Sequence, residues 1–304
     1  MTQILRGGIA SPERYDLGEG VLWDAAARVV RWVDIRVGRV LSARLAGDRL
    51  TGIAQTAVGQ TVGAVAPAAD GGLLVAAARG LAAISPLGAL TFGPPLLNDD
   101  RPVRFNDGAV DPQGRFIVGS LSMTGPIGTE VLLQVSPDGA VETLRSGIGL
   151  SNGIGWSPDG ATIYHIDTDS GTLSSHSYGP GGFATDEPWR AVITGFPGQP
   201  DGMRVDAEGL LWVAQWGAGC VVRYDLDGGE TARVEVEARQ PSCPGFIGED
   251  LDLLAITSAT EGLENPGAAD GAVFLVDPGV TGLPVNRWAG STSRPPWTPE
   301  KENA

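Results

Sequence analysis

Six segments of the chain repeat one pattern at a nearly constant spacing. Each segment has an apolar anchor, a polar turn and then a β-rich run; the anchors are Trp23, Ala66, Val110, Trp156, Val205 and Ile247. A period in the forties, made of short strands and turns, is typical of a β-propeller blade. Because the six repeats fill most of the 304 residues, we predict an all-β fold, a single six-bladed β-propeller over residues 1–290.

The turns and strands of the repeats agree with that prediction. The chain holds 45 Gly and 22 Pro, which suit many tight turns and disfavour long helices. Tryptophans recur at equivalent blade positions and are expected in the core; they are Trp23, Trp32, Trp156 and Trp212. We expect a strand near Ile4 to Ile9 to close the ring by pairing near Ala272 to Val276. Residues 291–304, rich in Pro and charge, are expected to form a disordered tail.

Charge and cysteine content narrow the class of protein. The net charge of −15 disfavours a nucleic-acid partner. No stretch is apolar enough to span a membrane, and the first ten residues do not resemble a signal peptide. Cys220 and Cys243 are too few for a disulfide framework and lack zinc-site spacing. We expect a cytoplasmic protein with two buried thiols, while its oligomeric state stays open.

A ring of equivalent positions lies four residues before the anchors. The innermost strand of each propeller blade lines the central channel, so these positions should face one another around the axis. The residues are Glu19, Val62, Asn106, Asn152, Asp201 and Cys243. A glycine follows directly in four of the six repeats, which lets the backbone turn without crowding the axis.

Two carboxylates and two amides therefore share one structural position. A buried carboxylate without a partner is costly, and no Lys or Arg stands elsewhere in the ring. A cation is the simplest partner, and an all-oxygen site suits Ca²⁺, Mg²⁺ or Mn²⁺. We therefore predict a central axial metal site. The alternative is that Glu19, Asn106, Asn152 and Asp201 bond only channel water and one another.

Arg104 lies two residues before Asn106 and should face the same way on a strand. A guanidinium at this place could hold a polar, oxygen-rich substrate. The alternative is a salt bridge to Asp99, Asp100 or Asp107.

Several longer motifs carry a resemblance to a known family. They are LGEGVLWD at 17–24, RWVDI at 31–35, RFNDGAVDPQGRF at 104–116, SNGIGWSPDG at 151–160, PDGMRVDAEGLLWVAQWG at 200–217 and LENPGAADGAVFLVD at 263–277. With these motifs the chain resembles the regucalcin/gluconolactonase (senescence marker protein) family. That resemblance implies a six-bladed propeller with one divalent metal on its axis, and hydrolysis of a sugar lactone.

The resemblance also implies residue roles. Glu19, Asn152 and Asp201 would bind the metal, and Asp201 would also act as general base. Arg104 and Asn106 would contact substrate hydroxyls. The metal would polarise the lactone carbonyl and lower the pKa of a bound water, whose proton Asp201 accepts. Which of Ca²⁺, Mg²⁺, Mn²⁺, Zn²⁺ or Fe²⁺ is bound stays open.

One stretch departs from the family pattern. Some members carry a substrate-contacting glutamate after the strand that here reads FIVGS, but residues 121–125 contain no acid. We expect Thr124 to lie on the substrate side here, and the particular sugar lactone stays open.

Two other functions remain possible on the same fold. The first is a phosphotriesterase or arylesterase resembling diisopropylfluorophosphatase or paraoxonase. The second is a non-catalytic divalent-metal-binding protein. Serine-hydrolase chemistry is disfavoured because G-x-S-x-G is absent, and no dinucleotide-binding G-x-G-x-x-G stands between a strand and a helix. His165 and His176 are expected to be structural.

Overall fold

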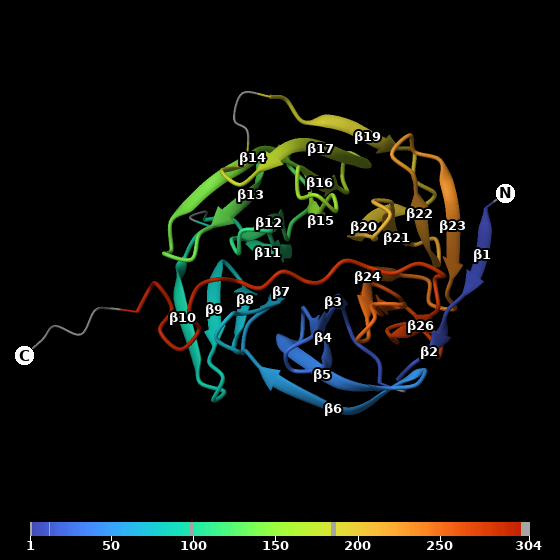
Figure 1. Cartoon of the computed structure of the whole chain (residues 1–304), viewed down its shortest axis with the longest axis horizontal. Coiled ribbons are helices and arrows are strands. Elements are labelled where there is room, and N and C mark those ends of the chain that lie inside the picture. The colour runs from blue at the N-terminus through green and yellow to red at the C-terminus, as the bar shows by residue number, and fades with distance from the viewer. Residues whose placement is uncertain (1, 12, 98–99, 184–186, 299–304) are drawn as a thin grey trace, which may run out of the picture.

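The computed structural model describes residues 2–11, 13–97, 100–183 and 187–298, which contain 26 strands and no helix. The strands form six sheets arranged around a central axis (Figure 1). This confirms the predicted six-bladed propeller. Among these residues we find no helix that could span a bilayer.

The first three blades are regular four-stranded antiparallel sheets, and the strands of each are given from the axis outward. Blade one is β3 (Gly18–Asp24), β4 (Val29–Asp34), β5 (Arg39–Ala46) and β6 (Arg49–Ala57). Blade two is β7 (Val62–Pro67), β8 (Leu73–Ala77), β9 (Gly80–Ile84) and β10 (Leu90–Pro95). Blade three is β11 (Val103–Val110), β12 (Phe116–Ser122), β13 (Glu130–Val135) and β14 (Val141–Ile148).

The last three blades include additional or shared strands. Blade four is β15 (Ser151–Trp156), β16 (Thr162–Asp167), β17 (Thr172–Gly179) and β19 (Arg190–Thr194), with β18 (Gly182–Phe183) also paired to β17. Blade five is β20 (Gln199–Val205), β21 (Leu211–Trp216), β22 (Cys220–Tyr224) and β23 (Glu230–Glu235). Blade six is β24 (Pro241–Ile247), β25 (Leu253–Ser258) and β26 (Phe274–Val276).

The N-terminal segment closes the ring and ties two blades together. Strand β2 (Gly8–Ile9) pairs antiparallel with β26 and completes blade six. This is the closure predicted from the sequence. Strand β1 (Gln3–Arg6) instead lies parallel to β23 at the outer edge of blade five. The predicted pairing with blade six was therefore wrong for the first part of the segment.

Buried aspartates form the turns that join inner to second strands. In blade five, Asp206 Oδ1 accepts backbone hydrogen bonds from Glu208 (2.9 Å) and Leu210 (3.0 Å). Its other oxygen accepts one from the indole Nε1 of Trp212 (3.0 Å), which is fully buried. Gly209 has a φ of 82°, as the D-x-x-G pattern requires. The turn motif thus also fixes a core side chain.

The C-terminal segment crosses one face of the propeller (Figure 1, red). It forms a bridge from Gly282 to Asp206 in the blade-five turn, and another from Trp288 to Ala68 after β7. Trp288 is fully buried in the cluster between blades two and three. We call residues 282–289 the strap, because they connect opposite sides of the ring.

Residues 291–298 also lie against the propeller, which differs from the disordered tail expected there. The side chain of Asp70 accepts hydrogen bonds from the backbone N–H groups of Thr292 (2.7 Å) and Ser293 (3.0 Å) and from the Thr292 hydroxyl (2.7 Å). Trp297 packs on the hydrophobic cluster beside blade two. The rest of the expected tail, 299–304, lies outside the described residues.

Every inner strand has an irregular register at the predicted ring. The pairing shifts between Glu19 and Leu22, Val62 and Ala64, Phe105 and Gly108, Ser151 and Ile154, Pro200 and Met203, and Pro241 and Pro244. The ring residue lies at or inside each break. A bulge bends its strand and redirects side chains. These bulges therefore explain how one position in each blade faces the axis.

Glycines after the ring residues let neighbouring inner strands approach closely. A Cβ on Gly63 would lie 2.2 Å from the carbonyl oxygen of Asn106 in the next blade. A Cβ on Gly153 would lie 2.9 Å from the carbonyl oxygen of Asp201. Only glycine avoids these clashes.

Candidate functional site

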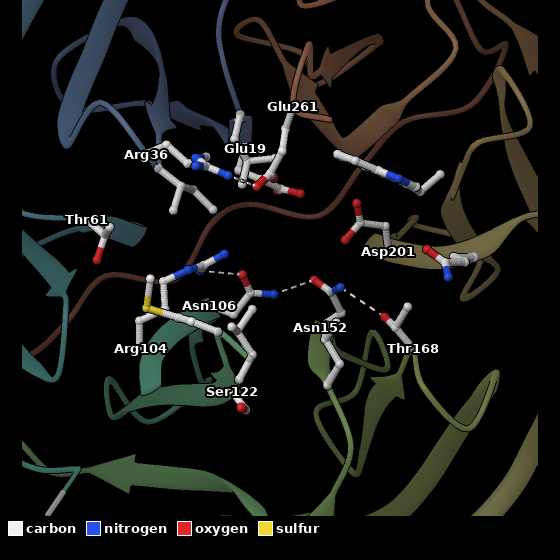
Figure 2. Close-up of a pocket in the computed structure, with 17 residues that line it drawn as sticks. Glu19, Arg36, Thr61, Arg104, Asn106, Ser122, Asn152, Thr168, Asp201 and Glu261 are labelled. Atoms are coloured by element: carbon white, nitrogen blue, oxygen red, sulfur yellow. Dashed lines mark hydrogen bonds and ion pairs between the residues drawn. The ribbon is translucent and has the colours of Figure 1, made fainter. Parts of the chain in front are cut away.

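A cavity of about 580 Å³ opens at the end of the axis where the inner strands begin. The four polar ring residues lie in its wall and project toward one another (Figure 2). A second cavity of about 340 Å³ lies at the other end, lined by anchor residues and the strap. The structure thus brings Glu19, Asn106, Asn152 and Asp201 together, each only 5 to 7% exposed.

A row of hydrogen bonds runs along one side of the first cavity (Figure 2). Arg104 Nη1 donates to Asn106 Oδ1 (2.8 Å), and Asn106 Nδ2 donates to Asn152 Oδ1 (3.0 Å). Asn152 Nδ2 donates to the Thr168 hydroxyl (2.9 Å), which donates to the Pro200 carbonyl (2.6 Å). Each amide is thereby held in one orientation by one neighbour from its own blade and one from the adjacent blade.

Asn106 Nδ2 also donates to the Ser151 carbonyl (2.9 Å), so this residue is held from two sides. Arg104 Nη1 donates a second bond to the Phe105 carbonyl (3.0 Å). Among the three aspartates considered as partners of Arg104, Asp99 lies outside the described residues. The contacts of Arg104 favour its placement in the cavity wall, beside the ring.

Three carboxyl groups gather near the axis. Burial, with a further contribution from the nearby Asp107 charge, raises the pKa of Glu19 to about 8. Burial raises the pKa of Asp201 well above its ordinary value, and the charges of Glu19 and Asp107 act in the same direction. Burial also raises the pKa of Asp107. These groups disfavour one another's ionised forms, and the nearby charges of Arg104 and Arg204 offset this only in part.

From the sequence, Asp107 was named only as a possible salt-bridge partner of Arg104, and no carboxyl group was predicted near the axis at this position. It follows the ring residue Asn106, so a regular strand would point it the other way. The register break between Phe105 and Gly108 leaves both residues in the irregular part of β11. Asp107 Oδ1 accepts a hydrogen bond from the Gly108 N–H (2.7 Å), and its buried Oδ2 accepts none from the residues that the structure describes.

The donor set fits a hard divalent cation. Within the described residues, no three Asp, Glu, His or Cys side chains come close enough to hold a metal alone. Two carboxylates, Glu19 and Asp201, and the amide oxygen of Asn152 would therefore share the task, with water completing the shell. An amide oxygen has two lone pairs, so Asn152 Oδ1 can still bind a cation while accepting from Asn106. Oxygen donors of this kind suit Ca²⁺, Mg²⁺ or Mn²⁺.

A thiol-preferring metal fits less well. Cys243 occupies the ring position of blade six, but its Sγ points to the Pro244 carbonyl (3.4 Å). Burial raises the pKa of this thiol well above its ordinary value, which opposes the thiolate that binds metals. Cys220 is also buried and unbridged.

The structure does not bring Thr124 into the cavity wall. This residue is exposed, and its hydroxyl is 3.1 Å from the Ser122 hydroxyl. Ser122 and Met123, from the same stretch, line the cavity instead. Neither supplies an acid.

The loops add cavity residues that the repeat pattern did not reveal. They lie at or after the end of a second strand, or at the start of an inner strand, and they are Arg36, Thr61, Thr168, Gln199, Trp216 and Glu261. Arg36 and Glu261 form an ion pair at the cavity wall (Figure 2). The loop positions have no periodic signature, although Thr168 and Trp216 are each the last residue of a β-rich run in the repeat.

Both histidines lie outside the residues that line the cavity. His165 Nε2 is 2.7 Å from the Ser151 hydroxyl, and its Nδ1 is 3.0 Å from Arg145. Burial, and then the Arg145 charge, hold the His165 pKa well below its ordinary value. His176 stacks on Phe183 with a 3.8 Å centroid distance. These contacts account for both imidazole rings as structural side chains, without a catalytic role.

Comparisons with known proteins show which family this chain belongs to. The family model described as SMP-30/Gluconolactonase/LRE-like region matches residues 17–260. The pentonolactonase XacC of Haloferax volcanii is 36% identical over 281 residues, 89% of this chain and 94% of that protein. The L-arabinolactonase of Azospirillum brasilense is 33% identical over 286 residues, 91% of this chain and 94% of that protein.

A solved structure supports the same assignment. The calcium-binding protein regucalcin from Agrobacterium tumefaciens has a TM-score of 0.87 and 30% identity, covering 95% of this chain and 99% of that one. The predicted resemblance is confirmed, and the chain belongs to the SMP-30/gluconolactonase/LRE-like family.

Proposed function

We propose that the protein hydrolyses a sugar lactone to the open-chain sugar acid in the axial cavity. The observation that carries this proposal is the buried carboxylate of Asp201 facing a fixed row of polar groups, Arg104, Asn106 and Asn152, across one cavity. A lactone of a polyhydroxy acid needs both features: a base at its carbonyl and donors for its hydroxyls. The names of the related pentonolactonase and arabinolactonase support the substrate class.

We further propose that one divalent cation belongs to the site, held by Glu19, Asn152 and Asp201. The clustering of buried carboxyl groups and the calcium-binding relative support this. When bound, such a cation supplies Lewis-acid polarisation of the lactone carbonyl. It also offsets the charge of carboxylates that are otherwise buried together.

The residues of the chain divide the reaction between them. Arg104 donates hydrogen bonds to oxygens of the substrate hydroxyls, and Asn106 helps to orient them, since both side chains are already fixed by hydrogen bonds. Asp201 accepts a proton from water as the water oxygen bonds to the carbonyl carbon. The carbonyl–ring oxygen bond then breaks, and the proton passes to the departing ring oxygen. The product is the hydroxy acid.

Substitution of the base tests the assignment. Asp201→Ala should lower the turnover of five- and six-carbon aldonolactones by about 10²- to 10⁴-fold relative to wild type, after the spontaneous rate is subtracted. The circular dichroism spectrum should not change. Asp48→Asn is the matched control, because Asp48 lies in an exposed outer turn. Near-normal turnover by Asp201→Ala would refute the role of Asp201.

The same assay separates the other candidate functions. An aryl phosphotriester, tested in parallel, would be the better substrate if the protein were a phosphotriesterase. Tight binding of a divalent cation by calorimetry, with no turnover of any aldonolactone, would instead identify a non-catalytic metal-binding protein.

A further inference from the structure

We propose that the ion pair between Arg36 and Glu261 at the cavity mouth selects uncharged polyhydroxy lactones over lactones that carry an anionic tail. This inference rests on the proposed lactonase function and deepens it. It concerns residues outside the ring, contributed by two loops.

The pair is built from neighbouring blades. Arg36 follows β4 in blade one, and Glu261 follows β25 in blade six. Arg36 Nη1 bonds Glu261 Oε1, and both residues line the cavity. The side chain of Arg36 is 55% exposed and that of Glu261 is 30% exposed, so a ligand can reach both. Figure 2 shows the pair across the cavity from Arg104.

Glu261 determines the charge at this mouth. Arg36 and Arg104 alone would present two guanidinium groups, the arrangement that binds sulfonate, phosphate or carboxylate. Glu261 pairs with Arg36 and also acts on Arg104: burial lowers the pKa of Arg104 to about 10, and Glu261 is the strongest of the neighbouring charges that oppose this lowering. The carboxylate thereby cancels one positive charge and repels an incoming anion.

The same carboxylate suits a neutral sugar. Its oxygens accept hydrogen bonds only, so the hydroxyls of a polyol tail are matching donors. The adjacent guanidinium supplies donors to the oxygens of those hydroxyls. A polyhydroxy tail can therefore bond both members of the pair, whereas an anionic tail would have to displace Glu261 to reach Arg36.

Arg36 has a second acidic neighbour that provides a matched control. Asp16 Oδ2 lies 3.5 Å from Arg36 Nε, and Asp16 is not among the residues that line the cavity. Asp16→Asn removes a carboxylate from the same arginine without changing the cavity wall. A purely structural ion pair would respond similarly to the loss of either acid.

The test compares two ligands with one skeleton. Wild-type protein, Glu261→Gln, Arg36→Met and Asp16→Asn would be assayed for kcat and KM with D-glucono-1,5-lactone and its 6-phosphate. Calorimetry would give Kd for gluconate and 6-phosphogluconate, so that binding is measured independently of turnover. Melting temperatures would report any loss of folding.

We expect Glu261→Gln to lower the preference for the neutral ligand by about tenfold, through KM and Kd rather than kcat. Arg36→Met should raise that preference, and Asp16→Asn should leave it within about twofold. Equal preferences in wild type and Glu261→Gln, by both KM and Kd, would overturn the inference. If neither the wild type nor any variant hydrolyses either lactone, the proposed function fails. The Kd ratios alone still test whether the Arg36–Glu261 pair discriminates between the two ligands.

Discussion

Replacing Thr168 with Val removes a hydroxyl that joins two blades at the site. The Thr168 oxygen accepts a hydrogen bond from Asn152 Nδ2 (2.9 Å) and donates one to the Pro200 carbonyl (2.6 Å). Valine keeps the shape of the side chain but leaves both partners without this contact. Asn152 is a proposed cation ligand, so its amide would lose the bond that orients it.

The expected magnitude follows from these two bonds. A buried polar group left without a partner costs about 1–3 kcal/mol, and every 1.4 kcal/mol is a factor of ten in affinity. Loss of an outer partner of a metal ligand weakens binding or activity by about 10- to 100-fold. We therefore expect Thr168→Val to weaken divalent-cation binding by about 10- to 100-fold.

Calorimetric titration of the chelated protein with Ca²⁺, Mg²⁺ and Mn²⁺ measures this effect. Thr172→Val is the matched control, because the Thr172 hydroxyl bonds the Ser170 carbonyl in the same blade, away from the cavity. Cation binding by Thr168→Val at wild-type affinity, in a folded protein, would refute the view that this hydroxyl positions Asn152.

Three further predictions concern the fold around the site. Trp288→Ala should lower the free energy of unfolding by about 3–5 kcal/mol, measured in urea, because its buried indole anchors the strap; a loss below 1 kcal/mol would contradict this. Gly63→Ala should weaken cation binding as well as stability, because its Cβ would lie 2.2 Å from the Asn106 carbonyl oxygen; unchanged calorimetric affinity would argue against it. Burial alone raises the pKa of Asp70, but hydrogen bonds from Thr292 and Ser293 lower it below its ordinary value. The contribution of these bonds to stability is therefore present above about pH 4 and is lost as the pH falls further. Limited proteolysis of residues 291–298 should increase in acid and, at neutral pH, in Asp70→Asn.

The repeat made much of the fold and ring accessible to prediction. Six anchors in near-constant phase located the six inner strands, and counting back four residues located the bulge in each. The prediction held because a bulge repeated in every blade keeps the residue count from anchor to axis constant. The ring closure at Gly8 and Ile9 was also predicted, as part of an N-terminal strand expected to pair with the last blade.

The features that were missed lack a periodic signal. Asp107 lies beside the ring only because the bulge breaks the alternation of a regular strand. Arg36 and Glu261 come from loops that differ between blades, so nothing in either blade predicts the pair. The placement of residues 291–298 depends on Asp70, a residue distant in sequence, and composition alone suggested a free tail.

The most direct test is hydrolysis of aldonolactones by protein whose metal content has been removed and verified. Acid release would be followed for five- and six-carbon lactones, before and after addition of Ca²⁺, Mg²⁺, Mn²⁺, Zn²⁺ or Fe²⁺, with Asp201→Ala in parallel. We predict that turnover is lost on chelation, returns with at least one divalent cation, and does not return in Asp201→Ala. Undiminished turnover by the metal-free protein, or by the variant, would contradict an axial metal site with Asp201 as its base.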